Sequence, residues 1–549
     1  MPTRGDRQKQ DLVDGIVRSL RRGQGKRAAD VERFTRGFFA NVPPRDCAEF
    51  VPESLQGAVT SLWNFVQSRK SATAKIRVFN PDKKKDGWET GHTIVEIVND
   101  DMPFLVDSVT AELNHRNLTV HLIIHPVVPV DRTGAGKLRG IAGEGEVSEI
   151  PSESVMHLQI TEQTDAALLT ELTASLAKVL ADVRAAVEDW RPMRVGIADV
   201  IAELDSTSPT ANVPKEEIVE TADFLRWLDN NNFTFLGYRD YVCKGTAKKQ
   251  TLSVVPKSGL GVLRDDKVTV IEGIADGAVL PPDLAAFMAR PALVLINKAN
   301  QRSTVHRGVH LDAILVKRFD ARGDTIGQRL FVGLFTSTVY NQQVDTIPVI
   351  RRKVRRLVDR AGYAPTSHDG KALIHILETL PRDELFQVGE KELREMATGI
   401  LHLQERQKVA MFVRRDPFGR YISCLVYAPR DRYNTRLRRQ IQSVIEAGFG
   451  GQVTAFYTQL SDEVLARLHF IVKTEPGKTF PKSIADIEAD IIEAARDWAD
   501  DLAHALASAQ GEIAGLATFD RYRHAFPENY RDRVTPVSAV ADIAKIGAV

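Results

Sequence analysis

The sequence is poor in several features that mark specialised protein classes. Only three cysteines occur, Cys47, Cys243 and Cys424, and their wide separation excludes a zinc ribbon and a disulfide framework. The 73 basic and 72 acidic residues nearly cancel, which argues against a dedicated nucleic-acid-binding protein. No apolar run approaches the roughly 20 residues that cross a bilayer, and the charged start, 1–10, lacks the apolar core of a secretion signal. We therefore predict a cytoplasmic protein with no membrane or nucleic-acid partner.

A chain of 549 residues is too long for one hydrophobic core and predicts three or four domains of roughly 150 residues each. The spacing of apolar and turn residues predicts an α+β multidomain protein in which ferredoxin-like sandwiches flank an antiparallel sheet domain. The predicted segments are a helical segment at 1–70, a first α+β unit at 71–200, a sheet domain at 215–345, a helical connector at 346–407, a second α+β unit at 408–510 and a C-terminal tail at 511–549.

The elements of the first α+β unit follow from its apolar periodicity. Strands are expected at 74–79, 92–98, 118–130 and 154–161, and helices at 103–116 and 165–189. The glycine-rich stretch 132–147 is predicted as a loop. The order strand, helix, strand, strand, helix is that of a ferredoxin-like sandwich.

The remaining elements are expected in three groups. A helix at 216–228 leads into a sheet of about five strands that starts at 233–238, and helices at 346–361, 369–380 and 388–407 follow. The second α+β unit is expected to have strands at 409–414, 421–427, 454–460 and 468–473, a helix capped by Asn434 or Thr435, and one long helix over 484–506.

The sequence contains no recognisable catalytic, cofactor-binding or metal motif. The stretch Gly134 to Gly140 comes nearest to a dinucleotide fingerprint, but its third glycine is one residue late and no helix follows it. His121 and His125 lie on one face of a predicted strand, and with Asp100 or Asp101 they form a conceivable metal site. Two histidines on a partly exposed sheet face are the simpler expectation. We predict no catalytic residue, cofactor or metal in this chain.

The turn after the strand at 92–98 is the best candidate for a functional site. It comprises residues 99–108 and opens the helix expected at 103–116. Free N–H groups and the positive dipole end at a helix N-terminus suit a carboxylate, and Asp101 is expected to cap this helix with Pro103 in its first turn. The candidate residues, for an amino-acid effector or for a contact between subunits, are Asn99, Asp100, Asp101, Met102, Phe104 and Ser108.

Several long runs resemble one known family. They are the turn 99–108 and the stretches 121–126, 227–238, 381–386 and 412–434. Together they resemble the N-terminal region of the large-type NAD-dependent glutamate dehydrogenases of bacteria. The resemblance implies ACT-like domains at 71–200 and 408–510, and a PAS-like domain at 215–345. It also implies that further domains, including the catalytic domain, follow in the longer protein.

The resemblance sets the functional expectations. The full-length enzyme would oxidise L-glutamate to 2-oxoglutarate and ammonia with NAD, as a tetramer or hexamer, and this segment would regulate it without supplying chemistry. In ACT domains the turn helps to bind amino-acid effectors, and the matching positions here are Asp101, Pro103 and, in place of a glycine, Phe104. Two alternatives stay open: a free-standing amino-acid sensor, and an unrelated hydrolase that uses His121, His125 and the Asp100–Asp101 pair.

Overall fold

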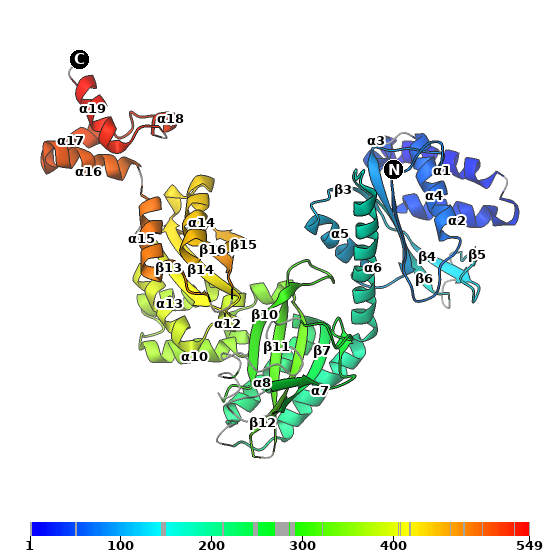
Figure 1. The fold of residues 1–549 in the computed structure, drawn as a ribbon, viewed down its shortest axis with the longest axis horizontal. Coiled ribbons are helices and arrows are strands. Elements are labelled where there is room, and N and C mark those ends of the chain that lie inside the picture. Colours follow the sequence, from blue (N-terminus) through cyan, green and yellow to red (C-terminus); the bar gives the residue numbers. More distant parts are fainter. Residues whose placement is uncertain are drawn as a thin grey trace. The chain divides into compact units, whose positions relative to one another are not determined.

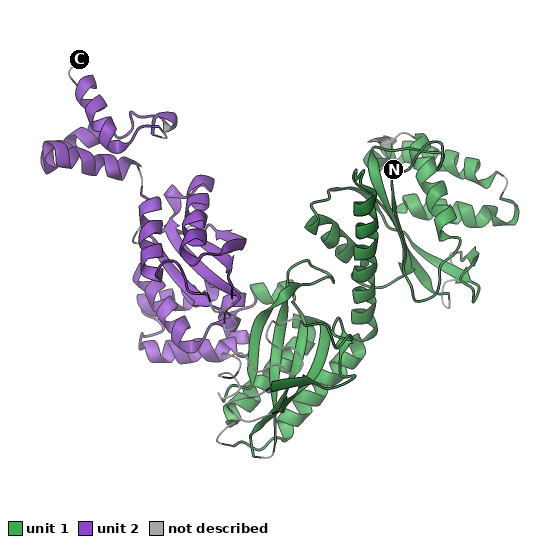
Figure 2. Cartoon of the chain, viewed as in Figure 1, with its two compact units in different colours: residues 1–280, 287–341 green, residues 281–286, 342–549 purple. Residues whose placement is uncertain are grey.

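The computed structural model describes residues 3–22, 24–49, 52–143, 150–210, 213–244, 251–269, 285, 291–320, 322–403, 406, 408–416, 419–461, 463–475, 478–496, 498–531 and 533–547. The chain divides into two compact units, residues 1–280 with 287–341 and residues 281–286 with 342–549 (Figure 2). Helices accompany three antiparallel sheets, which confirms the prediction of a mixed α+β protein with several sheet domains (Figure 1).

The first unit begins with a layer of helices, as the sequence predicts. The helices are α1 (Arg4–Arg21), α2 (Ala28–Ala40), α3 (Pro44–Glu49) and α4 (Pro52–Val66). Their apolar side chains, such as Phe34 and Leu62, share one core with Ile94 and Val98 of the first sheet. This layer therefore covers one face of that sheet.

The first sheet has the strand order β1-β2-β6-β4-β5, and β3 also pairs with β6. Two helices, α5 and α6, lie on the face opposite the N-terminal helices (Figure 1). The elements are β1 (Lys75–Phe79), β2 (His92–Asp100), α5 (Leu105–His115), β3 (Val120–Ile124), β4 (Val127–Arg132), β5 (Leu138–Ile141), β6 (Ser152–Thr161) and α6 (Ala166–Glu188).

Two expectations for this sheet are wrong. The single strand predicted at 118–130 is two strands, because Pro126 between β3 and β4 has no N–H to offer a neighbouring strand. The stretch 132–147 is not only a loop, since it contains β5, which pairs with β4. Gly136 at φ +80° makes the tight turn between these two strands. Residues 144–149 of that stretch lie outside the described residues.

The central sheet has the order β10-β11-β12-β7-β8, with β9 beside β7, so it has one strand more than the five predicted. Every pair of neighbours in it is antiparallel. The elements are α7 (Trp190–Ser206), α8 (Lys215–Trp227), β7 (Phe233–Lys244), β8 (Thr251–Val254), β9 (Leu260–Gly261), β10 (Val294–Arg302), β11 (His310–Phe319) and β12 (Thr325–Phe335).

The second unit contains a four-stranded sheet of order β13-β14-β16-β15. Its core joins the sheet to α14 and α15 through Cys424, Ile441 and Ile487. The helix predicted at 388–407 is preceded by a short helix that the sequence did not suggest. The elements are α10 (Ile350–Ala361), α11 (His368–Thr379), α12 (Arg382–Gln387), α13 (Glu390–Leu403), β13 (Ala410–Arg415), β14 (Tyr421–Pro429), α14 (Thr435–Phe449), β15 (Gln452–Gln459), β16 (Leu465–Lys473) and α15 (Ile484–Ala494).

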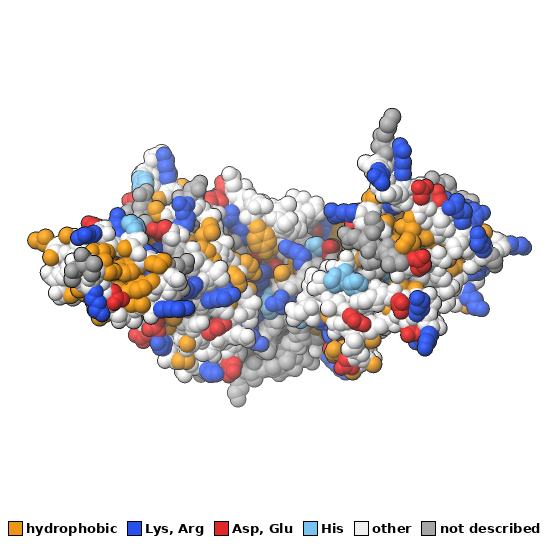
Figure 3. All heavy atoms as spheres, turned by 90° about the horizontal axis from the view of Figure 1, so that it is seen from above, with side chains coloured by type: hydrophobic (Ala, Val, Ile, Leu, Met, Phe, Trp, Pro, Cys, Tyr) orange, Lys and Arg blue, Asp and Glu red, His pale blue; other side chains and the backbone are white. Residues whose placement is uncertain are grey.

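The long helix predicted over 484–506 is wrong, because the chain forms two helices there. The second of them packs into a separate small core with the C-terminal helices, through Leu502, Leu506 and Phe526. The helices are α16 (Trp498–Gln510), α17 (Glu512–Tyr522), α18 (Glu528–Arg531) and α19 (Pro536–Ile546). Hydrophobic side chains also gather on the surface of these helices, among them the exposed Ile513 and Val537 (at the left of Figure 3).

Candidate functional site

The predicted turn connects β2 to α5, but it is built differently from the expectation. Phe104 is the N-cap of α5 and takes a left-handed backbone conformation, with φ +71°, and no side chain caps the helix. Asp101 is therefore not the cap, and Pro103 precedes the helix. The Asp101 N–H donates to the carbonyl of Ser152 at 3.0 Å, so this residue continues the pairing of β2 with β6. Phe104 occupies a backbone conformation in which glycine is normally favoured. The resemblance to ACT-type turns likewise places a glycine at the matching position.

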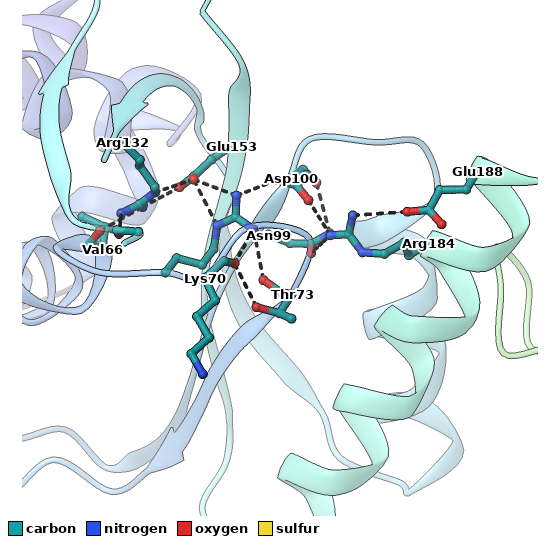
Figure 4. A network of polar contacts seen from close by, with 11 residues as sticks. Val66, Lys70, Thr73, Asn99, Asp100, Arg132, Glu153, Arg184 and Glu188 are labelled. Carbon is teal, nitrogen blue, oxygen red and sulfur yellow. Dashed lines mark hydrogen bonds and ion pairs between the residues drawn. The ribbon is translucent and has the colours of Figure 1, made fainter. Parts of the chain in front are cut away.

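Asp100 lies at the more exposed end of a network of charged side chains whose other members are mostly buried (Figure 4). Its carboxylate contacts Arg69 Nη2 at 2.5 Å and Arg184 Nη2 at 2.6 Å. Arg69 also contacts Glu153 at 2.8 Å, and Arg132 donates two hydrogen bonds to the same carboxylate, at 2.6 and 2.7 Å. The network thus joins five segments: the loop after α4, β2, β4, β6 and α6.

The network favours the charged form of the Asp100 carboxyl group. Burial alone would raise the pKa of Asp100, but hydrogen bonds from Arg69 and Arg184 outweigh it and lower that pKa. Arg184 also donates to Asn99 Oδ1 at 2.8 Å, which orients its guanidinium. The Asp100 side chain is 33% exposed, and an incoming ammonium group would have to approach it against the positive charges of two guanidinium groups.

The loop between β10 and β11 of the central sheet contacts the start of α5. The rings of Phe104 and His306 lie 5.1 Å apart, centroid to centroid, and the His306 N–H donates to Ser108 Oγ at 2.9 Å. His306 Nδ1 lies 3.0 Å from Asp107 Oδ2. Since His306 also has a positive φ, +68°, two left-handed non-glycine residues meet at this contact.

The same loop contacts α6 beside α5. Thr304 Oγ1 donates to Asp182 Oδ2 at 2.8 Å. Burial raises the pKa of Asp182, although this hydrogen bond acts against the increase. A Cβ at Gly308 would lie 3.5 Å from the Ala111 methyl, so the loop backbone also approaches α5 closely. The loop therefore contacts both α5 and α6, the two helices on this face of the first sheet.

The structure does not assemble the suggested metal site. The His121 ring lies 4.6 Å from the His92 ring, whereas His125 Nε2 lies 2.6 Å from Ser154 Oγ. Burial lowers the pKa of His125, and Asp100 is already engaged by two arginines. Across the residues that the structure describes, no group of three or more His, Cys, Asp or Glu side chains is placed to hold a metal ion.

Sequence reasoning identified the turn but missed the residues that engage it. Of the candidates, Asn99, Asp100, Asp101, Phe104 and Ser108 take part in the contacts above, and Met102 is half-buried. The missed residues are Arg69, Arg132, Glu153, Arg184 and His306. Charged residues such as Glu153 and Arg132 in apolar strands were the only local signal, because a charge is seldom buried without a partner.

Four family models, each for a different part of glutamate dehydrogenase, match this chain, and together they cover more than half of it. They are "Glutamate dehydrogenase, ACT1 domain" at residues 34–176, "helical motif 1" at 347–406, "ACT2 domain" at 410–499 and "helical motif 2" at 505–549. The chain belongs to the family of the large NAD-specific glutamate dehydrogenases. It corresponds to their N-terminal region, as the resemblance predicted.

Relatives named NAD-specific glutamate dehydrogenase share most of this chain. The protein from Halomonas elongata is 38% identical over 539 residues, which is 98% of this chain and 33% of the relative. The protein from Pseudomonas aeruginosa is 35% identical over 97% of this chain and 33% of the relative. The protein from Mycobacterium tuberculosis is 31% identical over 82% of this chain and 27% of the relative. The chain thus spans about a third of the length of these glutamate dehydrogenases.

The family match names the two ferredoxin-like units as ACT domains. The ACT1 match contains the first sheet with α5 and the first half of α6, and the ACT2 match contains the sheet β13-β14-β16-β15 with α14 and α15. None of the family matches names the central sheet. Among the described residues, no helix is both long and apolar enough to span a membrane.

Proposed function

We propose that this chain is the regulatory and oligomerisation segment of an NAD-dependent glutamate dehydrogenase. The complete protein converts L-glutamate, NAD and water into 2-oxoglutarate, ammonia and NADH, and its downstream catalytic domain binds the NAD. The observation that carries the proposal is the similarity over 98% of this chain to a third of an NAD-specific glutamate dehydrogenase, together with the two ACT matches. The partners of the segment are that catalytic domain and further copies in a tetramer or hexamer.

Within this role, we assign the turn 99–108 to a contact inside the chain. Both acidic side chains of the network are paired with arginines, and Phe104 packs against His306. These contacts favour a joint between the first sheet and the central sheet over an amino-acid site. We further propose that the central sheet is the PAS-like domain, because its six antiparallel strands lie between the two ACT domains in the sequence.

The enzymatic part is tested by comparing the full-length gene product with the isolated 549-residue chain. The full-length protein is expected to reduce NAD when glutamate is added, and the isolated chain is expected neither to do so nor to bind NAD in a calorimetric titration. Micromolar NAD binding by the isolated chain contradicts the assignment. A gene that encodes only these residues, without a catalytic domain, favours a free-standing sensor instead.

The assignment of the turn is tested by a thermal-shift screen of the twenty amino acids. We expect none of them to change the melting temperature of the isolated chain or of the Phe104→Gly variant, because each carboxylate of the network is already balanced by two arginines. An amino acid that raises the melting temperature of the wild type, but not that of Asp100→Ala, establishes the turn as an effector site.

A further inference from the structure

A pocket of about 380 Å³ lies at one end of the second sheet, where β13 ends beside α15 (Figure 1). Small-molecule sites in proteins have volumes of about 300–1,000 Å³, so the size of this pocket suits a metabolite. Its wall consists of Arg415, at the end of β13, and residues 478–483 of the loop that leads into α15. Among these described residues, three are basic and none is acidic. The pocket is therefore suited to an anion.

The loop 478–483 is held in place by α14. The Phe480 ring lies edge-on to the Phe449 ring, with the two centroids 5.2 Å apart. The Lys482 N–H donates to the carbonyl of Gly448 at 3.2 Å. Because these contacts fix the loop from within the chain, binding a ligand requires little further ordering of the pocket wall.

Arg415 is the basic residue best placed to bind an anion. Its guanidinium lies over the Phe480 ring, 4.4 Å from the ring centroid, and no carboxylate in the described part of the chain contacts it. The Arg415 side chain is exposed. Stacking on a ring occupies the face of the guanidinium and leaves the N–H groups at its edge able to donate, and two of them match the oxygens of a phosphate group. The ring therefore positions Arg415 without using its donors.

Two lysines of the loop add positive charge. Lys482 Nζ lies 2.5 Å from Asp490 Oδ2, and Lys478 Nζ lies 3.4 Å from Glu475 Oε2. All four side chains are at least 41% exposed, and exposed ion pairs contribute little free energy. Each ammonium group can therefore turn toward an anion in the pocket at small cost.

The pocket is separate from the turn of the second sheet that corresponds to the turn 99–108. In the second sheet that turn follows Pro429 and joins β14 to α14. The pocket lies at the other end of β14, where Arg415 pairs with Ile422. The nine residues of β14 place the two ends roughly 26 Å apart, at about 3.3 Å per residue. The pocket is therefore a different site from the ACT-type turn.

We propose that this pocket binds a small metabolite through its phosphate group. Arg415 donates two parallel hydrogen bonds to the phosphate, and Lys478 and Lys482 balance the remaining charge. A phosphate monoester carries a charge of about −1.5 to −2 at pH 7 and three strong acceptor oxygens, so it matches three basic side chains better than a single carboxylate does. The bound metabolite links the end of β13 to the loop before α15 and stabilises the second unit. The proposal depends neither on the glutamate dehydrogenase activity nor on the turn 99–108.

Calorimetric titration of the purified 549-residue chain with sodium pyrophosphate, in a buffer free of other multivalent anions, tests the pocket. We expect a single binding site. Arg415→Gln is expected to weaken the affinity by about 10–100-fold, because it removes hydrogen bonds to a charged group. The matched control is Arg439→Gln, an exposed arginine about 15 Å along α14 from Phe449, which is expected to bind as the wild type does. Two results overturn the proposal: no binding at millimolar pyrophosphate, or an equal loss in the control, which indicates an adventitious ion only.

Two further titrations test the chemistry of the ligand and the geometry of the arginine. Tricarballylate carries three carboxylates and no phosphate, and it is expected to bind about 10-fold more weakly than pyrophosphate. Equal affinities would show a general polyanion surface and overturn the phosphate assignment. Arg415→Lys keeps the charge but loses the two parallel hydrogen bonds, so it is expected to bind pyrophosphate about 5–10-fold more weakly than the wild type. Wild-type affinity in this variant would contradict the role assigned to Arg415, and circular dichroism of each variant confirms folding.

Discussion

The two ACT domains have the same strand order, β1-β2-β6-β3 in the first and β13-β14-β16-β15 in the second, yet they start their first helix differently. In the second domain, Asn434 caps α14 by accepting a hydrogen bond from the N–H of Leu437 at 2.9 Å. In the first, the bulky Phe104 takes a left-handed conformation and no side chain caps α5. A strained residue persists only when its surroundings hold it, and here the His306 loop does so. The difference marks the first turn as a place of contact.

The two domains also differ in the charges between each sheet and the helices that precede it. In the first, Arg77 and Glu96 lie on neighbouring strands, and Ser61 of α4 donates to Glu96 at 3.2 Å. In the second, Arg414 lies on the sheet but its partner, Glu384, comes from helix α12, at 2.7 Å. Arg77 is 35% exposed, whereas Arg414 is 2% exposed. The second pair therefore links helix α12 to its sheet through an ion pair that is shielded from solvent.

The largest difference is expected when the glutamate of each pair is removed. Glu384→Ala leaves Arg414 buried without its carboxylate and is expected to destabilise the second unit by about 3–5 kcal/mol. Glu96→Ala is expected to cost less, about 1–3 kcal/mol, because Arg77 can turn toward solvent. Differential scanning calorimetry of both variants measures the effect, and equal losses would show that burial of the arginine does not matter.

Acid should remove the stability that the Glu384 carboxylate gives to the second unit. Burial alone would raise the pKa of Glu384, but the charge and hydrogen bonds of Arg414 outweigh it and hold that pKa well below its usual range. A lowered folded-state pKa gives stability that is fully present above the unfolded value of about 4.3 and is lost as the pH falls toward the folded value. The second unit should therefore lose stability below about pH 4. In Glu384→Gln this part of the pH dependence should disappear, which urea unfolding at pH 3 to 6, on the scale of ordinary carboxyl titration, can detect.

The stability of variants at Phe104 should depend on whether the new residue tolerates a positive φ more than on the size of its side chain. Phe104→Ala keeps the left-handed strain and loses the ring contact, so we expect a loss of about 1–2 kcal/mol. Phe104→Gly loses the same contact but relieves the strain, and it should be about 1 kcal/mol more stable than the alanine variant. Thermal unfolding of the two variants gives the difference, and a glycine variant that is less stable than the alanine variant would refute the strained conformation.

The smallest effect concerns the two candidate caps. Asn434→Ala should cost about 1 kcal/mol, because the N–H of Leu437 loses its acceptor. Asp101→Ala should leave the start of α5 unchanged, since its side chain caps nothing there. Denaturant titrations of both variants compare the caps directly, and a larger loss for Asp101→Ala would restore the original sequence-based assignment.

The sequence predicted elements whose signals are local. Periodic apolar residues placed β2, β6, α5 and α6 within a few positions, and Asn434 was one of the two residues expected to cap α14, because a cap needs only its own helix. The left-handed Phe104 was not predictable, because local preference disfavours it and His306, some 200 positions later in the chain, stabilises it. The break between α15 and α16 was also not predictable, because the helical spacing of apolar residues continues through Trp498. At this break the chain passes from the core of the second sheet to the small C-terminal core.

A double-mutant cycle at Phe104 and His306 tests most directly whether the turn is an internal joint. Glycine fits the positive φ at both positions, so Phe104→Gly and His306→Gly remove the rings without straining the backbone. We expect the effects on the free energy of unfolding to be coupled by about 0.5–1.5 kcal/mol, as for rings in contact. Strictly additive effects would contradict the joint and would leave the turn open as a site for a ligand.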